Sequence, residues 1–354
     1  MRILFLVPYP IEGASNRYRV EQYLPYLEKA GIEYRLKPFW SNSGFRLLYK
    51  PGQRLAKFYF FLLGSISRLF DLFTLFRYDT VFIHREAYPI GGAFFERILR
   101  ILKKPFIFDF DDAIYLATSS HSNYFVEKYK RPDRVAAIIK MSKHVIAGNE
   151  HLAEFARNYN GSVSVIPTPI DTDRYCPNQP NSSAEVTIGW IGSVTTISFL
   201  NLLRNVFIRF SREFPSVKFK IVGGNFNINN LSNIICKPWS LAEELEDLSS
   251  FDIGVMPMPE DRWTEGKCGF KAILYMSMGI ATVCSPVGVN KTIISDGLNG
   301  FLAKDEQEWF TKLSRLVEDV QLRKRLASAG RKTVEERYSL SVNLPAFLKV
   351  LTGK

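Results

Sequence analysis

The sequence has few of the residues that build disulfide frameworks and metal centres. It contains four cysteines and four histidines in 354 residues, and no two cysteines form a Cys-x-x-Cys pair. A disulfide-stapled domain and a cysteine-type zinc site are therefore not indicated, and this cysteine usage is typical of a cytosolic protein. The histidines are scattered and receive no catalytic role; they are His84, His121, His144 and His151.

Familiar nucleotide-binding and targeting motifs are also missing. Neither a Gly-x-Gly-x-x-Gly fingerprint nor a Walker lysine motif follows the first apolar run, which argues against a dinucleotide-dependent dehydrogenase and an NTPase. The N-terminal stretch MRILFLVPYP has one basic residue and a five-residue apolar run before Pro8. That run is shorter than the apolar region of a signal peptide, and we interpret it as a first buried strand.

Negative charge is in short supply. The formal net charge is +11, and from Arg35 to Lys104 there are 13 Lys and Arg against 4 Asp and Glu, an excess of nine. Such a balance favours an anionic partner, which the charge alone leaves open between nucleic acid, a phosphorylated ligand and a membrane surface. Nucleic acid has only the net charge in its favour, so we expect none.

Short apolar runs alternate with helical patterns in both halves of the chain, which is typical of α/β domains with parallel sheets. The pattern restarts after the polar, proline-bearing stretch at 176–185, so two doubly wound domains are expected, with ligands beyond the carboxyl ends of the strands. The expected strands are ILFLV, TVFIH, PFIFDF, HVIAG and VSVIP in the first half and VTIGWIG, VKFKIVGG, FDIGVMP and IATVCSP in the second.

A glycine-rich, lysine-bearing turn precedes one of the predicted helices. Gly266 and Gly269 flank Lys267, and Lys271 falls in the first turn of the helix. A helix N-terminus carries a partial positive charge, and two nearby lysines would make it a site for a diphosphate. The local pattern leaves it equally open that both lysines cover a surface turn.

The segment GKCGFKAILYMSMGIATVCSPVGVNKTIISDGLNGFLA resembles the C-terminal signature of glycosyltransferase family 4, and VIPTPIDTDRY and IGWIGS resemble two further elements of that family. The resemblance covers nearly the whole chain. It implies the GT-B fold, in which two Rossmann-like doubly wound domains face each other across a cleft. The expected parts are an acceptor-binding domain at 1–175, a nucleotide-sugar donor-binding domain at 176–338, and a C-terminal helix at 339–354 that packs back toward the first domain.

The chain departs from the family at two charged positions. Family members usually carry two glutamates, of which the second binds ribose; here Gly266 and Leu274 occupy those positions, with Glu265 adjacent to the first. The Arg and Lys that grip the diphosphate in many members are replaced by Ser193, Thr195 and Thr196. Lys271 becomes the leading catalytic cation and Lys267 the second, while ribose recognition has no obvious residue.

The resemblance and the glycine turns together give a set of predicted site residues. Trp239 is expected to stack on the base, although a core position is an alternative, and Arg17 and Arg19 are expected on the acceptor side unless they lie on a solvated helix face. The predicted donor-binding residues are Gly13, Ala14, Ser15, Gly192, Ser193, Gly223, Trp239, Glu265, Gly269, Phe270 and Lys271.

Asp109-x-Asp111 in FDFDD looks like a metal-binding motif of other glycosyltransferases. No further carboxylate or histidine cluster supports it, so no metal site and no cofactor beyond the nucleotide sugar co-substrate are expected. Asp111 and Asp112 follow a strand, and we assign them to sugar or acceptor recognition in the catalytic site. Capping of the next turn is an equal alternative.

The stretch from Lys57 to Arg77 is strongly apolar, with Lys57, Gly64, Arg68 and Asp71 on one helical stripe. Two internal charges argue against a membrane span. The stretch suits a core helix or a helix that lies on a membrane, and the basic excess favours the membrane.

These features predict a metal-independent glycosyltransferase that moves a sugar from a nucleotide sugar to a glycan acceptor, expected to be lipid-linked and part of a bacterial surface polysaccharide such as lipopolysaccharide. Retention at the anomeric carbon is implied by the family resemblance alone. The expected location is cytoplasmic, with a peripheral position on the inner face of the membrane. Two alternatives stay open. They are a non-catalytic GT-B partner subunit, which the missing ribose glutamate suggests, and a nucleotide-sugar 2-epimerase.

Overall fold

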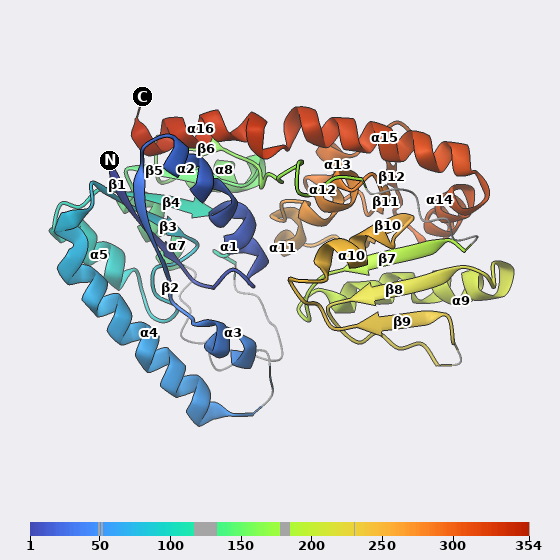
Figure 1. Ribbon diagram of the computed structural model, residues 1–354, viewed down its shortest axis with the longest axis horizontal. Coiled ribbons are helices and arrows are strands. Elements are labelled where there is room, and N and C mark those ends of the chain that lie inside the picture. Colours follow the sequence, from blue (N-terminus) through green and yellow to red (C-terminus); the bar gives the residue numbers. More distant parts are fainter. Residues whose placement is uncertain (49, 51, 117–132, 178–184, 230, 354) are drawn as a thin grey trace. The chain divides into compact units, whose positions relative to one another are not determined.

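The computed structural model describes residues 1–48, 50, 52–116, 133–177, 185–229 and 231–353 (Figure 1); His121 lies outside them. The chain divides into two compact units, Met1–Pro169 with Asn343–Lys354, and Ile170–Val342. The first unit thus ends before the predicted residue 175. The reason is that the Ile170 N–H donates to the Tyr338 carbonyl (2.9 Å) and the Tyr175 hydroxyl donates to Glu244 (2.7 Å), both in the second unit.

The first unit is built on a six-stranded parallel sheet of order β2-β1-β3-β4-β5-β6. The apolar runs form the central strands, whose residues are buried. Sequence reasoning missed β2, an edge strand with the half-exposed, charged sequence EYRLKP. The strands are β1 Arg2–Val7, β2 Glu33–Pro38, β3 Thr80–His84, β4 Phe106–Phe110, β5 His144–Ala147 and β6 Val163–Val165.

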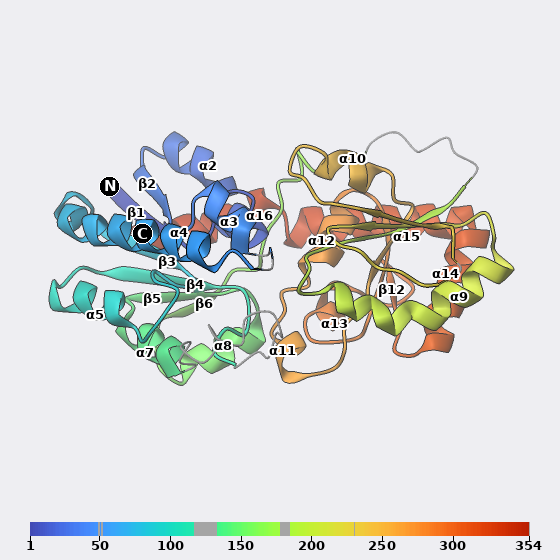
Figure 2. The ribbon, with the colours of Figure 1, turned by 90° about the horizontal axis from the view of Figure 1, so that it is seen from below.

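Helices cover both sides of this sheet, with α2 and α16 on one side and α7 and α8 on the other (Figure 2). The helical periodicity of residues 17–30 is interrupted around Val20, because Pro25 cannot continue a helix and instead stands in the first turn of α2. From Asn343 on, α16 belongs to the first unit, where Phe347 stacks on Tyr23 at 4.0 Å. The helices are α1 Ala14–Arg19, α2 Leu24–Lys29, α3 Asn42–Leu48, α4 Arg54–Thr74, α5 Phe94–Ile101, α7 Asp133–Met141, α8 Glu150–Arg157 and α16 Leu340–Thr352.

The second unit has a parallel sheet of order β12-β11-β10-β7-β8-β9. Its core gathers large buried rings, among them Trp190, Phe207 and Phe219. The strands are β7 Thr187–Ile191, β8 Lys218–Val222, β9 Ile234–Lys237, β10 Ile253–Met256, β11 Ala281–Cys284 and β12 Phe301–Leu302. The helices are α9 Arg204–Glu213, α10 Glu244–Ser249, α11 Arg262–Glu265, α12 Phe270–Ser277, α13 Asn290–Ile293, α14 Glu306–Glu318 and α15 Val320–Arg337.

Each sheet reverses its strand order once, which defines where a ligand is expected. The reversal lies between β1 and β3 in the first unit and between β7 and β10 in the second. In open α/β sheets the crevice for a ligand opens at the carboxyl ends of the strands that flank this reversal. The predicted site residues follow these strands, in two groups that belong to different units.

Candidate functional site

The second-unit group is organised around the start of α12. Gly269 caps this helix with a φ of +63°, and a Cβ there would lie 2.4 Å from Cδ1 of Ile293. Only glycine fits such a left-handed, crowded position without strain. The Tyr275 hydroxyl of α12 accepts the N–H of Ile191 at 3.0 Å, which fixes the helix at the carboxyl end of β7.

Lys271 lies in the first turn of α12 and is partly buried. Its Nζ donates to the Thr196 hydroxyl at 3.4 Å and lies 5.4 Å from the centre of the Trp190 ring. Among the residues described, no carboxylate pairs with it. Burial, followed by the charge of Lys267, lowers the pKa of Lys271 to about 8. A cation withdrawn from water without an acidic partner is unfavourable, and an anionic ligand would offset that cost.

Gly192 and Gly223 do not offer the free amides that sequence reasoning assigned to the donor. The Gly192 N–H donates to the Val222 carbonyl (3.0 Å) and the Gly223 N–H to the Lys237 carbonyl (2.9 Å). Their role is close approach, since a Cβ on Gly223 would lie 1.9 Å from the Gly192 carbonyl oxygen and one on Gly192 would lie 2.8 Å from Cε of Lys271. Gly192 leaves room for the Lys271 side chain, and Gly223 leaves room for the Gly192 backbone.

The other predicted site residues of this unit differ in burial and in their contacts. Phe270 opens α12, and the Lys267 amine lies 3.6 Å from the centre of the Trp263 ring. Trp239 is half-buried and its indole N–H donates to Glu244 at 2.8 Å, so it is no core tryptophan. Ser193 is exposed and its hydroxyl lies 2.7 Å from that of Thr195, while Glu265 is exposed on α11.

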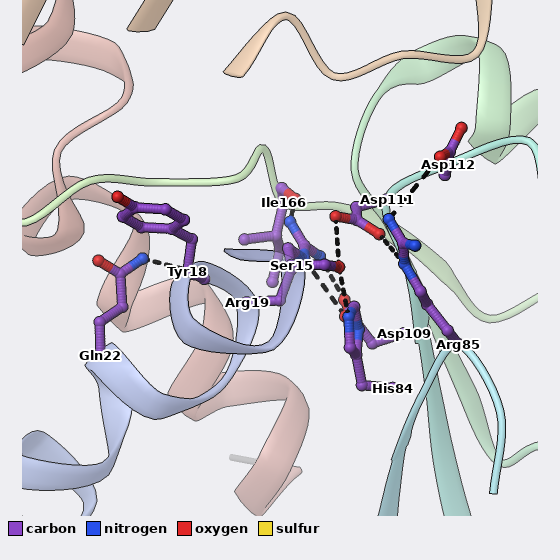
Figure 3. Close-up of polar contacts among 10 residues, drawn as sticks. All are labelled: Ser15, Tyr18, Arg19, Gln22, His84, Arg85, Asp109, Asp111, Asp112 and Ile166. Carbon is purple, nitrogen blue, oxygen red and sulfur yellow. Dashed lines mark hydrogen bonds and ion pairs between the residues drawn. The ribbon is translucent and has the colours of Figure 1, made fainter. Parts of the chain in front are cut away.

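In the first unit, a chain of hydrogen bonds joins the carboxyl ends of β3 and β4 to α1 (Figure 3). The Ser15 hydroxyl lies 2.7 Å from Nε2 of His84, whose Nδ1 lies 2.6 Å from Oδ2 of Asp109. Ser15 also donates to Oδ2 of Asp111 at 2.8 Å. Because its single proton is given to Asp111, Ser15 accepts a hydrogen bond from His84 Nε2 in this arrangement.

The carboxylates of Asp111 and Asp112 both lie close to the Arg85 guanidinium. The Arg85 Nε donates to Asp111 at 2.6 Å, and Asp112 lies 3.8 Å from a guanidinium nitrogen. Although burial alone would raise the pKa of Asp111, the charges of Arg85 and His84 lower it below the ordinary value. Asp111 is therefore ionised at neutral pH and acts as a hydrogen-bond acceptor. Arg85 itself has a φ of +58°, a left-handed conformation rare for a side chain of this size.

Arg17 and Arg19 do not lie on a solvated helix face, since both are buried. Arg19 forms a doubly hydrogen-bonded ion pair with Asp109 and donates to the Ile166 carbonyl at 2.6 Å. Arg17 donates to the Ile11 carbonyl (3.3 Å) and the Tyr18 hydroxyl (3.2 Å). The Arg19 guanidinium is thus committed to contacts inside the first unit, and its acceptor-side role stays a prediction.

Two further residues of the predicted donor site, Gly13 and Ala14, lie at the start of α1. The Gly13 N–H donates to the Pro10 carbonyl at 2.8 Å, so it is not free for a phosphate, while Ala14 is exposed. Both carboxylate oxygens of Asp109 are held by Arg19 and His84, which makes this residue a poor metal ligand. Across the ranges that the structure describes, no group of three or more His, Cys, Asp and Glu residues is arranged to hold a metal ion.

Sequence reasoning missed His84 and Arg85. In the sequence they are marked only by their position, since His84 ends the buried run TVFIH and Arg85 follows it. Polar residues at the carboxyl end of a strand beside the reversal of strand order are where a ligand site is expected.

Comparison with known proteins supports this reading of the fold. Residues 185–319 match the family model described as Glycosyl transferases group 1, and no curated protein matches the chain. The UDP-glucose complex of Alr3699/HepE from Anabaena is similar, with a TM-score of 0.70 at 14% identity over 100% of both chains.

Two other solved structures have a similar fold. Sucrose-phosphate synthase from Thermosynechococcus elongatus has a TM-score of 0.73 at 14% identity over 100% of this chain and 98% of its own. A glycosyltransferase from Rickettsia africae has a TM-score of 0.69 at 16% identity over 99% of this chain and 97% of its own. The chain therefore has the GT-B fold of two Rossmann-like units, and residues 185–319 are similar to glycosyl transferases of group 1.

Proposed function

We propose that the protein is a glycosyltransferase that uses a nucleotide sugar and binds the diphosphate of this donor at the first turn of α12. The observation that carries the proposal is Lys271, a partly buried cation with no acidic partner in the described part of the chain, set beside a helix N-terminus. A diphosphate would supply the missing negative charge at the positive end of the helix dipole.

The same cation serves the chemistry. When the glycosidic bond of the donor breaks, negative charge grows on the leaving diphosphate, and a fixed cation in a partly dry site stabilises that charge best. Lys271 and the N-terminus of α12 fill this role, with Lys267 as a second charge. The Anabaena relative was solved with UDP-glucose, so UDP and its sugars are the first donors to test.

The first-unit cluster suits recognition of hydroxyl groups. Asp111 is ionised and partly exposed, so it accepts a hydrogen bond from a sugar or acceptor hydroxyl but cannot act as an acid at neutral pH. Asp112 stands beside it as a second acceptor. His84 and Asp109 act as positioning residues, because they hold Ser15 against Asp111.

We further propose that the transfer retains the configuration at the anomeric carbon, on the basis of the resemblance to glycosyltransferase family 4. The acceptor proposed is a lipid-linked bacterial surface glycan, made on the cytoplasmic side of the membrane. A product assay separates the two alternatives. A 2-epimerase releases an altered sugar without any acceptor, and a non-catalytic partner subunit gives no product.

Activity should survive exhaustive treatment with EDTA. The reason is that Asp109 is committed to Arg19 and His84, and Asp111 to Arg85 and Ser15, while Lys271 supplies the positive charge that a divalent ion would otherwise bring. Initial rates of sugar transfer before and after EDTA check this. Loss of activity that Mn²⁺ or Mg²⁺ restores would contradict it and revive the Asp109-x-Asp111 metal site.

The value of kcat/KM for the donor should fall as the pH rises through about 8. Below the pKa of Lys271, lowered to about 8, the amine is charged and binds the diphosphate; above it the charge is lost. A profile of kcat/KM against pH reports the free enzyme. Lys271→Arg should keep the charge and move the alkaline limb upward. Identical profiles for the two proteins would show that another group titrates.

A further inference from the structure

Helix α4 of the first unit buries a polar stripe and exposes most of its large apolar residues. Its buried residues are Gly64, Arg68 and Asp71, spaced so that they share one stripe. Arg68 donates to Asp71 (3.1 Å) and to the carbonyls of Val7 (3.2 Å), Lys37 (3.1 Å) and Ala87 (2.8 Å). The polar stripe therefore anchors α4 to the carboxyl ends of β1 and β2.

The close approach of α4 depends on its one glycine. A Cβ on Gly64 would lie 2.6 Å from the carbonyl oxygen of Phe39, which follows β2. Since this glycine and the charged pair occupy the inner stripe, the apolar residues of the helix are directed outward. Leu55 is 87% exposed, Phe70 65%, Phe73 75% and Phe76 78%. An ordinary surface helix buries its apolar stripe and exposes its charges.

The outer residues recur at helical spacing and form one continuous face, here called the α4 apolar face. Figure 1 shows α4 along the outside of the first unit, with α5 beside it. Exposed apolar patches of this extent mark interaction sites in soluble proteins. The face consists of Leu55, Phe58, Tyr59, Leu62, Leu63, Ile66, Leu69, Phe70, Phe73 and Phe76.

The α4 apolar face continues onto α5. A cavity of about 260 Å³ lies between the two helices, and its walls include Leu69 of α4, Ile90, and Phe94 and Phe95 of α5. Phe94 is exposed, as are Ile101 and Leu102 at the far end of α5. The surface thus combines a broad apolar face with an apolar recess that can admit part of a hydrocarbon chain.

Basic residues border this surface. Arg97, Arg100 and Lys103 are exposed on and after α5. Arg54 is exposed at the start of α4, and Arg77 is exposed in the 3₁₀ turn that follows α4. An apolar helix face with cations at its rim matches the acyl chains and headgroups of an anionic bilayer. A second copy of the chain would instead bring the same cations face to face, which is repulsive.

We propose that the α4 apolar face lies in the interfacial layer of an anionic membrane, with α4 parallel to the bilayer and the recess between α4 and α5 taking up a lipid chain. By length and composition Arg54–Arg77 could also cross a membrane. Crossing would pull Arg68 and Asp71 away from the carbonyls that hold them and place both charges in hydrocarbon, where they are costly. The inference uses the first unit alone and is independent of the proposed transfer reaction.

Flotation of the full-length protein with lipid vesicles tests the proposal. The protein should float with vesicles that contain phosphatidylglycerol at low salt and should be released as salt shortens the electrostatic reach to about 10 Å at 0.1 M. Phe70→Ser with Phe73→Ser should lower the partition coefficient at least about tenfold, or about 1.4 kcal/mol. The matched control is Leu298→Ser, since Leu298 is 72% exposed in the second unit and should not change flotation.

A fluorescence measurement gives the location. The fluorescence of the tryptophan introduced by Phe73→Trp should be quenched by vesicles of brominated phospholipid, whereas that of the tryptophan introduced by Leu298→Trp should not. Failure of the native protein to float at low salt would overturn the proposal, as would equal flotation of the double serine variant. A dimer that the double variant dissociates, with no flotation, would assign the face to a second copy. Sugar transfer to a soluble acceptor, measured in parallel, reports separately on the proposed function.

Discussion

Replacing Lys271 with Met should lower kcat/KM about a hundredfold, which corresponds to about 2.7 kcal/mol of transition-state stabilisation. The melting temperature should stay the same or rise. Burial lowers the pKa of Lys271 to about 8, so the folded protein holds this charge at a cost that a methionine of similar length removes. Steady-state kinetics with the donor and a thermal melt of the same preparation check both parts.

Two matched lysine variants sharpen the test. Lys267→Met should lose less activity, because the Lys267 amine lies against the Trp263 ring at 3.6 Å. Lys267 also precedes α12, whereas Lys271 lies in its first turn. Lys291→Met, an exposed lysine of α13, should leave kcat/KM unchanged. Native activity in Lys271→Met would place the diphosphate elsewhere.

Replacing Arg19 with Leu should lower the free energy of unfolding by about 3–5 kcal/mol, the usual cost of removing one partner of a buried ion pair. Arg19 and Asp109 are both almost inaccessible to solvent, at 2% and 1% of the side chain. The Arg19 charge also lowers the pKa of Asp109, which burial alone would raise. Without Arg19, the Asp109 carboxylate keeps its hydrogen bond with His84 but loses the charge of the guanidinium. Denaturant unfolding of the variant measures the loss.

The double variant Arg19→Leu with Asp109→Asn separates a structural role from an acceptor-binding role. It removes both charges, so it should be more stable than Arg19→Leu alone, and the single variant Asp109→Asn completes the cycle that gives the coupling energy of the pair. If Arg19→Leu were as stable as the native protein but lost acceptor affinity, Arg19 would bind the acceptor as the sequence first suggested.

The fold was predictable because its signal is spread along the chain. Buried central strands such as β3 and β10 are nearly continuous apolar runs, and that pattern occurs in each half. The edge strand β2 was missed because its charged residues face solvent. The break between α1 and α2 was missed because one proline weighs little in a window of helical periodicity.

Within the candidate site, only relations between residues close in the sequence were predictable. Lys271 follows Gly269 within one turn, so their relation is visible in the sequence. The Arg19–Asp109 pair joins residues 90 positions apart, and Ser15 meets His84 across 69. Such contacts depend on how β1, β3 and β4 lie in the sheet. The amides of Gly192 and Gly223 are likewise committed by the neighbouring strands, which no local pattern shows.

Nucleotide binding by the native protein and by Lys271→Met tests the proposed diphosphate site most directly. A calorimetric titration with UDP, backed by the other nucleoside diphosphates and by the matching nucleosides, measures it. We expect a diphosphate to bind the native protein and to bind Lys271→Met at least about tenfold more weakly, or about 1.4 kcal/mol, while the nucleoside binds both proteins alike. Equal affinity of the two proteins for the diphosphate, or no binding of any nucleotide by the native protein, would contradict the proposal.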